Sequence, residues 1–115
     1  MSIITIIDIV VYCIYNGYML LSVPVEFQWD SGNSDKNLIK HNVTNQEIEE
    51  IFFDINKRIF EDKTHSIGEN RFIVVGKTEY GRLLYVVCTS RNGLVRVISA
   101  RDINRKEEYI YEKTS

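Results

Sequence analysis

Two tight turns in the second half of the chain most constrain its fold. They separate three runs rich in Val, Ile, Tyr and Phe: RFIVVGKT (71–78), RLLYVVCTS (82–90) and LVRVISA (94–100). Such runs are typical of β-strands, and the Asn-Gly pair within RNG (91–93) is a strong signal for a hairpin turn. Strands joined by connections this short must be antiparallel. The pattern predicts a three-strand antiparallel meander.

A short strand and a short helix are predicted directly after residue 25. Residues 26–29 form the strand candidate, and the turn-rich stretch DSGNSD (30–35) ends it. Ser34 or Asp35 is placed to N-cap a helix that runs through Lys40. Asn42 follows as a plausible left-handed residue that ends the helix.

A second helix is predicted to begin at Thr44, because Glu47 three residues later completes a capping-box pattern. Its apolar residues recur at helical spacing: Ile48, Ile51, Phe52 and Ile55. The charged run RDINRKEEYIYEK (101–113) predicts a C-terminal helix. At 115 residues the chain fits one domain. The expected class is α+β, with a short N-terminal strand, two helices, the meander and a C-terminal helix against one antiparallel sheet.

The charges are unevenly distributed although the formal net charge is only −2. Residues 71–106 carry eight basic and two acidic residues, whereas residues 44–70 carry seven acidic and three basic ones. A basic face attracts phosphates, and an acidic face can hold a basic partner. Arg96 alternates with Val95 and Val97, so it lies on the open face of the sheet if these valines fill the core.

Residues 1–24 differ from the rest, because they are rich in Ile, Val and Tyr and contain no Lys or Arg. Three interpretations stay open: an extension from an upstream start, with Met19 as an internal alternative; a weak membrane or export segment; or an extra strand or helix. Asp8 and Asn16 interrupt the apolar run, which disfavours a membrane helix. Residues 25–115 are expected to form the folded domain.

The sequence contains neither a metal-binding nor a cofactor-binding motif. Cys13 and Cys88 lack metal-ligand spacing and imply no disulfide framework, so we expect a reducing cytoplasm, with Cys88 as a small core residue. There is no His/Cys cluster for zinc, no Gly-rich phosphate loop and no familiar Ser-His-Asp motif. We therefore expect no metal and no cofactor.

Four short blocks in a fixed order carry a family resemblance: F-x-W-D (27–30), K-H-N-V (40–43), H-S-x-G-E-x-R-F (65–72) and R-x-I-S-A-R (96–101). From about Val25 to Lys113 the chain resembles the BrnT family of type II toxin–antitoxin toxins. The resemblance implies a RelE-like fold and a cytoplasmic, growth-inhibiting ribonuclease. It also implies a BrnA-like DNA-binding antitoxin, operator DNA contacted only through the toxin–antitoxin complex, and no membrane association for residues 25–115.

Metal-independent RNA cleavage uses the ribose 2′-hydroxyl as nucleophile and needs proton transfer and positive charge at the phosphate. RelE-like sites commonly supply these from Lys, Arg and Tyr, and arginine can clamp a phosphate with two hydrogen bonds. The catalytic candidates are Arg71, Arg82, Arg96 and Arg101, which would hold the phosphate, and Lys40 and His41, either of which would move protons. The RNA-binding candidates are His65, Glu69, Tyr85 and Arg105.

Each candidate also has a structural interpretation. Lys40 and His41 would favour the C-terminal end of a helix dipole, Arg71 and Arg82 would be solvated strand-end charges, and His65 and Glu69 would order a loop. Arg96 and Arg101 would pair with Glu26, Asp30 or Glu69, and Tyr85 would be a core residue. Arg91, Lys77 and Lys113 are expected to be plain surface charges. The alternative function is a non-catalytic module that binds the antitoxin and acts as co-repressor.

Overall fold

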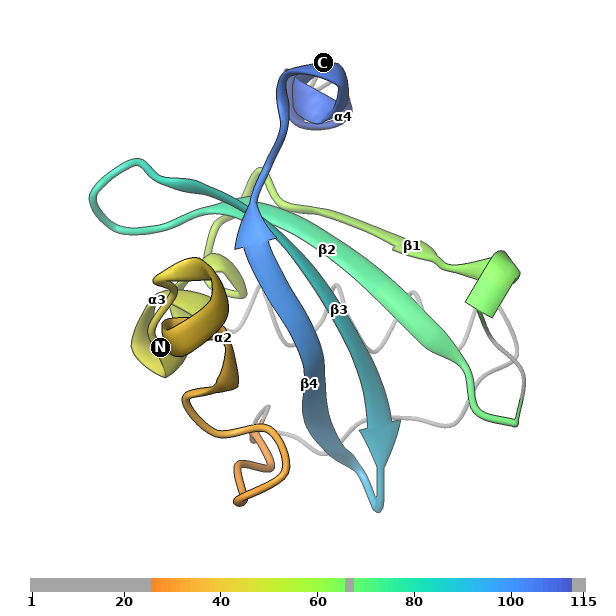
Figure 1. Ribbon diagram of the computed structural model, residues 1–115. Helices are drawn as coiled ribbons and strands as arrows, with labels where there is room; N and C mark the ends of the chain where they lie inside the picture. Colours follow the sequence, from red (N-terminus) through yellow and green to blue (C-terminus); the bar gives the residue numbers. More distant parts are fainter. Residues whose placement is uncertain (1–25, 66–67, 113–115) are drawn as a thin grey trace.

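Four strands pair in one antiparallel sheet whose spatial order follows their order in the chain (Figure 1). They are β1 (Arg58–Glu61), β2 (Arg71–Lys77), β3 (Leu83–Arg91) and β4 (Leu94–Asp102). The structure is a computed structural model that describes residues 26–65 and 68–112. The predicted meander is confirmed as β2–β3–β4, and the α+β class with it. Asn92 and Gly93 form the β3–β4 turn with φ angles of 53° and 78°, as the Asn-Gly signal predicts.

Two helices precede the sheet, and one follows it. Helix α2 spans Lys36–His41, α3 spans Asn45–Ile51, and α4 spans Glu108–Glu112. The predicted capping box of α3 is confirmed, because Glu47 N donates to the Thr44 hydroxyl and Thr44 N donates to the Glu47 carboxylate. Asn42 ends α2 with φ 56°, as expected. Asp35 precedes α2, but its side chain forms no capping hydrogen bond.

The prediction of an N-terminal strand is wrong, because only Phe27 pairs, in a single parallel bridge with Val95. Two backbone hydrogen bonds hold this contact, from Gln28 N to Val95 O and from Val95 N to Glu26 O. The chain then leaves the sheet at a turn in which Asn33 N and Ser34 N both donate to Asp30 O. The fourth strand is β1, which pairs with β2 and was not predicted.

Two predicted helices have the wrong bounds. Helix α3 ends at Ile51 rather than Ile55, because the Asp54 carboxylate accepts hydrogen bonds from Asn56 N and Lys77 N and stabilises a turn there. Ile55 is 66% exposed. The C-terminal helix does not begin at Arg101, which lies in β4. Helical structure starts only after Asn104, with the short 3₁₀ helix η2 (Arg105–Glu107).

The core lies between the sheet and helix α3, with Val43 from the connection between α2 and α3. It is formed by residues from every layer: Val43, Ile48, Ile51, Phe52, Phe72, Val74, Leu84, Val86, Cys88, Val95, Val97 and Ala100. Phe27, Trp29 and Ile59 pack against it. Helix α3 approaches β2 so closely that a Cβ on Gly76 would lie 2.9 Å from Ile51 Cβ, which explains the glycine at that position. Cys88 is a buried free thiol, as expected.

Segment 28–37 covers the outer edge of β4 with side-chain amides. Asn33 Nδ2 donates to Val97 O at 3.1 Å and to Gln28 O at 3.0 Å. Asn37 Oδ1 accepts from Ala100 N at 3.0 Å. Both asparagines are buried. These hydrogen bonds satisfy polar groups of an edge strand and fix α2 beside β4.

A β-bulge interrupts the pairing of β3 with β4. Cys88 pairs with Val97 and Val87 pairs with Ser99, so Ile98 is the extra residue. Paired residues share a face of the sheet. Arg96 pairs with Thr89 and Arg101 with Tyr85, and all four lie on the face away from the core.

The expectations for residues 1–24, and for Cys13 among them, fall outside the described residues. Within residues 26–65 and 68–112, no helix is long and apolar enough to cross a membrane.

Candidate functional site

Arg71 and Arg96 lie in one row across the sheet. Arg71 pairs with Thr89, and Thr89 pairs with Arg96, so both arginines flank Thr89 on the same face. Thr89 is 2% exposed, and its hydroxyl donates to Asn70 O at 2.7 Å. A polar hollow of about 200 Å³ lies at this end of the sheet, lined by Gly32, Asn33, Lys36, Glu69, Arg71, Arg91, Arg96, Val97 and Ile98.

We call the four cations of this hollow, Lys36, Arg71, Arg91 and Arg96, the basic cluster. Lys36 comes from the start of α2, and its Nζ donates to Ile98 O at 2.7 Å. The bulged residue therefore supplies the carbonyl that holds this lysine. The four residues come from α2, β2, β3 and β4, so the fold brings together charges that are distant in the sequence.

Two carboxylates balance part of this positive charge. Arg96 forms hydrogen bonds to Asp30 at 2.7 and 3.2 Å, and Arg91 forms two to Glu69, both at 3.1 Å. The Arg96 guanidinium holds the pKa of Asp30 below its usual range. The Arg91 guanidinium does the same for the pKa of Glu69, with smaller effects of Arg71 and Arg96. Both carboxylates are therefore ionised at neutral pH, and neither can donate a proton there.

Arg101 and Tyr85 form a second polar group on the same face, four β3 positions from Thr89, or about 14 Å along the strand. The Arg101 guanidinium lies over the Tyr85 ring, with its central carbon 4.2 Å from the ring centroid. Arg101 also binds both carboxylate oxygens of Glu107 at 2.8 Å. Burial raises the pKa of Tyr85 above its usual value. One face of this tyrosine is therefore already covered by a guanidinium.

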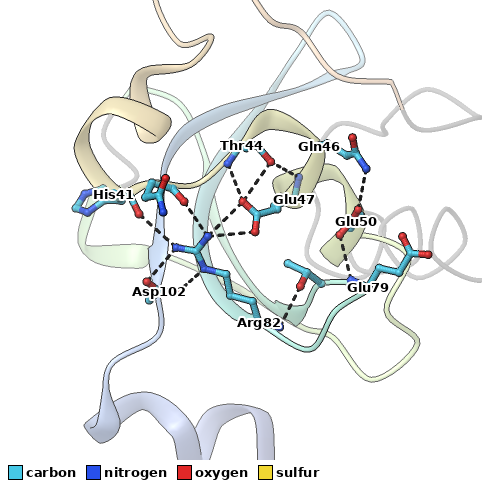
Figure 2. Close-up of polar contacts among 10 residues, drawn as sticks. His41, Thr44, Gln46, Glu47, Glu50, Glu79, Arg82 and Asp102 are labelled. Atoms are coloured by element: carbon cyan, nitrogen blue, oxygen red, sulfur yellow. Dashed lines mark hydrogen bonds and ion pairs between the residues drawn. The ribbon is translucent and has the colours of Figure 1, made fainter.

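Arg82 lies on the other side of the sheet, at the junction of α2, α3 and the end of β4 (Figure 2). Its Nε and one terminal nitrogen bind the two oxygens of Asp102 at 2.6 and 3.0 Å. The other terminal nitrogen binds Asn42 O at 2.8 Å and Glu47 at 3.1 Å.

A further Arg82 hydrogen bond reaches His41 O at 3.3 Å, so all five guanidinium N–H donors have partners. These contacts cap the exposed carbonyls at the end of α2 and bind the glutamate of the α3 capping box. The Asp102 carboxylate, with Glu47, raises the pKa of Arg82 further. This geometry joins two helices to the sheet.

Lys40 and His41 occupy the last turn of α2, at the end away from Lys36. Lys40 is exposed, and His41 is half-buried. The His41 carbonyl points to Arg82, whereas its ring points away from that guanidinium (Figure 2). Neither residue lines the hollow of the basic cluster.

The other candidates are scattered. Glu69 lies in the hollow, and Arg105 is exposed in η2. His65 ends the short 3₁₀ helix η1 (Lys63–His65), but its side chain falls outside the described part of the structure. Of the ten predicted site residues, the hollow brings together Arg71, Arg96 and Glu69. In the described part of the chain, no group of three or more His, Cys, Asp or Glu residues is arranged to hold a metal ion.

The sequence interpretation missed Lys36 and Arg91. Arg91 had a usable signal, because it follows Thr89 by two positions on β3 and so must share its face. The position of Lys36 depends on the bulge at Ile98, which alternation does not reveal.

Residues 29–107 match the model of the ribonuclease toxin, BrnT, of type II toxin–antitoxin systems. The chain belongs to the BrnT toxin family. The matched region of this BrnT family member contains the whole basic cluster, the Arg82 contacts and Glu107. No curated protein matches the sequence.

Membership in the BrnT family supports a ribonuclease toxin role and implies an antitoxin partner. A ribonuclease must bind a chain of phosphates, and basic side chains are the groups that bind them.

Proposed function

We propose that this protein is a metal-independent endoribonuclease toxin in which the basic cluster holds the scissile phosphate. One observation carries the proposal: Lys36, Arg71, Arg91 and Arg96 converge on one hollow in a chain of the BrnT family. Their positive charge would stabilise the additional negative charge that develops on the phosphate during cleavage.

In the proposed reaction the ribose 2′-oxygen forms a bond to phosphorus while the bond from phosphorus to the 5′-oxygen breaks. The ionised Glu69 carboxylate accepts the proton of the 2′-hydroxyl, and the Lys36 ammonium gives a proton to the departing 5′-oxygen. The products are a 2′,3′-cyclic phosphate end and a 5′-hydroxyl end. Both groups line the same hollow as the arginines.

The remaining candidates take other roles in this proposal. Arg101 and Tyr85 contact the RNA strand farther along the same face, and Arg105, four residues after Arg101, contacts it as well. Arg82 is a positioning residue that fixes α2 and therefore Lys36. Lys40 and His41 are proposed to contact RNA outside the hollow, and His65 to contact it from the loop before β2.

We further propose that the fold is RelE-like and that the toxin acts in the cytoplasm and arrests growth. A BrnA-like antitoxin neutralises it, and operator DNA is contacted only by the complex of the two proteins. Inducing the gene in a bacterial host, with and without the antitoxin gene, tests growth arrest and its rescue.

The direct test is RNA cleavage by the purified chain in the presence of a metal chelator, followed on a gel. We expect fragments with cyclic phosphate ends, and strongly reduced cleavage by the Arg71→Ala variant. Lys106→Ala removes one exposed charge from η2 and serves as the matched control. Cleavage that requires added metal, or that persists in Arg71→Ala at the level of the control, contradicts the proposed site.

A second function is favoured by a specific observation: Arg82, Arg91, Arg96 and Arg101 each already form an ion pair with a carboxylate. A domain in which these charges serve the fold could act only as antitoxin partner and co-repressor. In that case the complex would form and bind operator DNA while RNA stayed intact in the cleavage assay.

A further inference from the structure

A second hollow, of about 460 Å³, lies far from the basic cluster. It is lined by Glu50, Phe53, Asp54, Ile55, Lys77, Thr78 and Glu79. These residues belong to the end of α3, the turn that follows it and the β2–β3 connection. Lys77 ends β2 whereas Arg71 begins it, so the two hollows are about 20 Å apart along the strand.

Large apolar side chains are exposed at this hollow. Phe53 is 39% exposed and Ile55 is 66% exposed. Tyr80, next to Glu79 in the β2–β3 connection, is 93% exposed. Apolar groups gathered at one exposed hollow are typical of protein-binding surfaces.

The carboxylates of this hollow differ from those that lie beside the arginines of the molecule. Asp30, Glu47, Glu69, Asp102 and Glu107 each form an ion pair with an arginine. Within the described residues, Glu50, Asp54 and Glu79 have no such cationic partner.

The hydrogen bonds that Glu50 and Asp54 accept leave their negative charge uncompensated. Glu50 accepts from Gln46 Nε2 and from Glu79 N, as Figure 2 shows. Asp54 accepts from Lys77 N and from the Tyr111 hydroxyl. The one lysine of the hollow, Lys77, places its Nζ 5.4 Å from the centroid of the Tyr111 ring.

We infer that this acidic hollow is the anchor for the antitoxin, and that it takes a segment in which Lys or Arg residues flank a large apolar side chain. The apolar side chain fills the space between Phe53 and Ile55, and the basic groups meet Glu50 and Glu79. Charge complementarity argues for this occupant, because the same carboxylates repel RNA phosphates.

The inference rests on the antitoxin partner that family membership implies, and not on the nuclease chemistry. Its anchor is separate from the basic cluster, so binding and RNA cleavage can be measured independently. The antitoxin can block the toxin by extending from this anchor toward the basic cluster.

The test is titration calorimetry of the full chain with the antitoxin encoded beside it. The double variant Ile55→Ser/Glu79→Lys changes two exposed residues of the acidic hollow. We expect its Kd to rise at least about tenfold and its salt dependence to weaken. RNA cleavage, where the parent chain shows it, should not change.

Ile39→Ser/Glu108→Lys is the matched control, because it makes the same two changes at exposed residues of α2 and α4. Thermal unfolding of both variants checks that they fold. Unchanged binding by the Ile55→Ser/Glu79→Lys variant would overturn the inference. A loss of binding confined to Arg71→Ala would also overturn it, because the antitoxin would then bind at the basic cluster. A dimer of the toxin alone that dissociates in the Ile55→Ser/Glu79→Lys variant would overturn it as well. If the parent chain shows no nuclease activity, the binding measurement still tests this inference.

Discussion

Arg96 and Arg101 lie on the same face of the sheet although they are five positions apart on β4. Strict alternation would place residues with an odd separation on opposite faces. The bulge at Ile98 adds one residue between them and restores a common face. Bulges are frequent next to functional sites because they re-aim side chains in this way.

The Arg96–Asp30 ion pair allows two opposing substitutions. Arg96→Ala should weaken RNA binding, because one cation is lost. The slope of the logarithm of the RNA-binding constant against the logarithm of the salt concentration should become shallower by about one, the value for one phosphate contact. Asp30→Asn breaks the same pair but leaves the Arg96 charge free to bind phosphate. We expect it to bind RNA at least as tightly as the parent chain, measured by fluorescence anisotropy across salt concentrations. Equal loss in both variants would show that the pair acts only through the fold.

Removing Arg82 should destabilise the protein. Arg82→Ala removes the ion pairs to Glu47 and Asp102 and the donors to the last carbonyls of α2. We expect the free energy of unfolding, measured in urea, to fall by about 2–4 kcal/mol. Arg105→Ala, at an exposed residue of η2, is the control and should change it by less than about 0.5 kcal/mol. A similar small change for Arg82→Ala would refute the positioning role.

Acid should destabilise the protein through its arginine-bound carboxylates. Arg96, Arg91, Arg82 and Arg101 lower the pKa of Asp30, Glu69, Asp102 and Glu107 respectively, below ordinary values of 3.8 for Asp and 4.5 for Glu. A carboxyl whose pKa is lower in the folded state than in the unfolded state stabilises the fold at pH values above the unfolded-state pKa. This stabilisation is lost as the pH falls through the folded-state pKa. Urea unfolding should therefore show stability declining from about pH 5 downward.

The Glu107→Gln variant isolates one of these contributions. It should have a shallower decline with acid than the parent chain, because one of the arginine-bound carboxylates no longer titrates. Identical pH profiles for the two proteins would contradict the assignment.

Alkaline titration should detect Tyr111 as a tyrosine with a raised pKa. Burial and the hydrogen bond to Asp54 raise the pKa of Tyr111 to about 12. Tyr111→Phe should remove a component of the phenolate absorbance titration near pH 12. The raised pKa also stabilises the fold below the usual tyrosine pKa of 10.0, and this contribution disappears as pH rises toward about 12. A titration near pH 12 that is the same in Tyr111→Phe as in the parent chain would argue against the Asp54 contact.

The sequence predicts those parts of the fold that depend on local interactions. The Asn92-Gly93 turn, the Thr44 capping box and the left-handed Asn42 each need only a few neighbouring residues, and all three are confirmed. The bounds of α3 depend on Asp54 accepting from Lys77 N, 23 positions away. The prediction from the spacing of apolar residues alone therefore extended the helix to Ile55, four residues beyond its end at Ile51.

The candidate site depends even more on distant contacts. Arg71 and Arg96 could be predicted because they lie on predicted strands, where side chains alternate between the two faces of the sheet. The Arg101–Glu107 pair required knowing that β4 continues to Asp102, and the position of Lys36 required the bulge. Which carboxylate pairs with which arginine is a property of the assembled sheet and cannot be read from residue types.

The amides of Asn33 and Asn37 give the molecule a way to avoid polymerising. An uncovered edge strand can pair with the edge of another molecule and seed fibrous aggregates. On β4 the carbonyl of Val97 and the amide of Ala100 are already bound by these two side chains. A neighbouring molecule that tried to add a strand at this edge would first have to displace buried asparagines. Asn33 before α2 and Asn37 within it therefore also protect this edge against strand addition at high protein concentration.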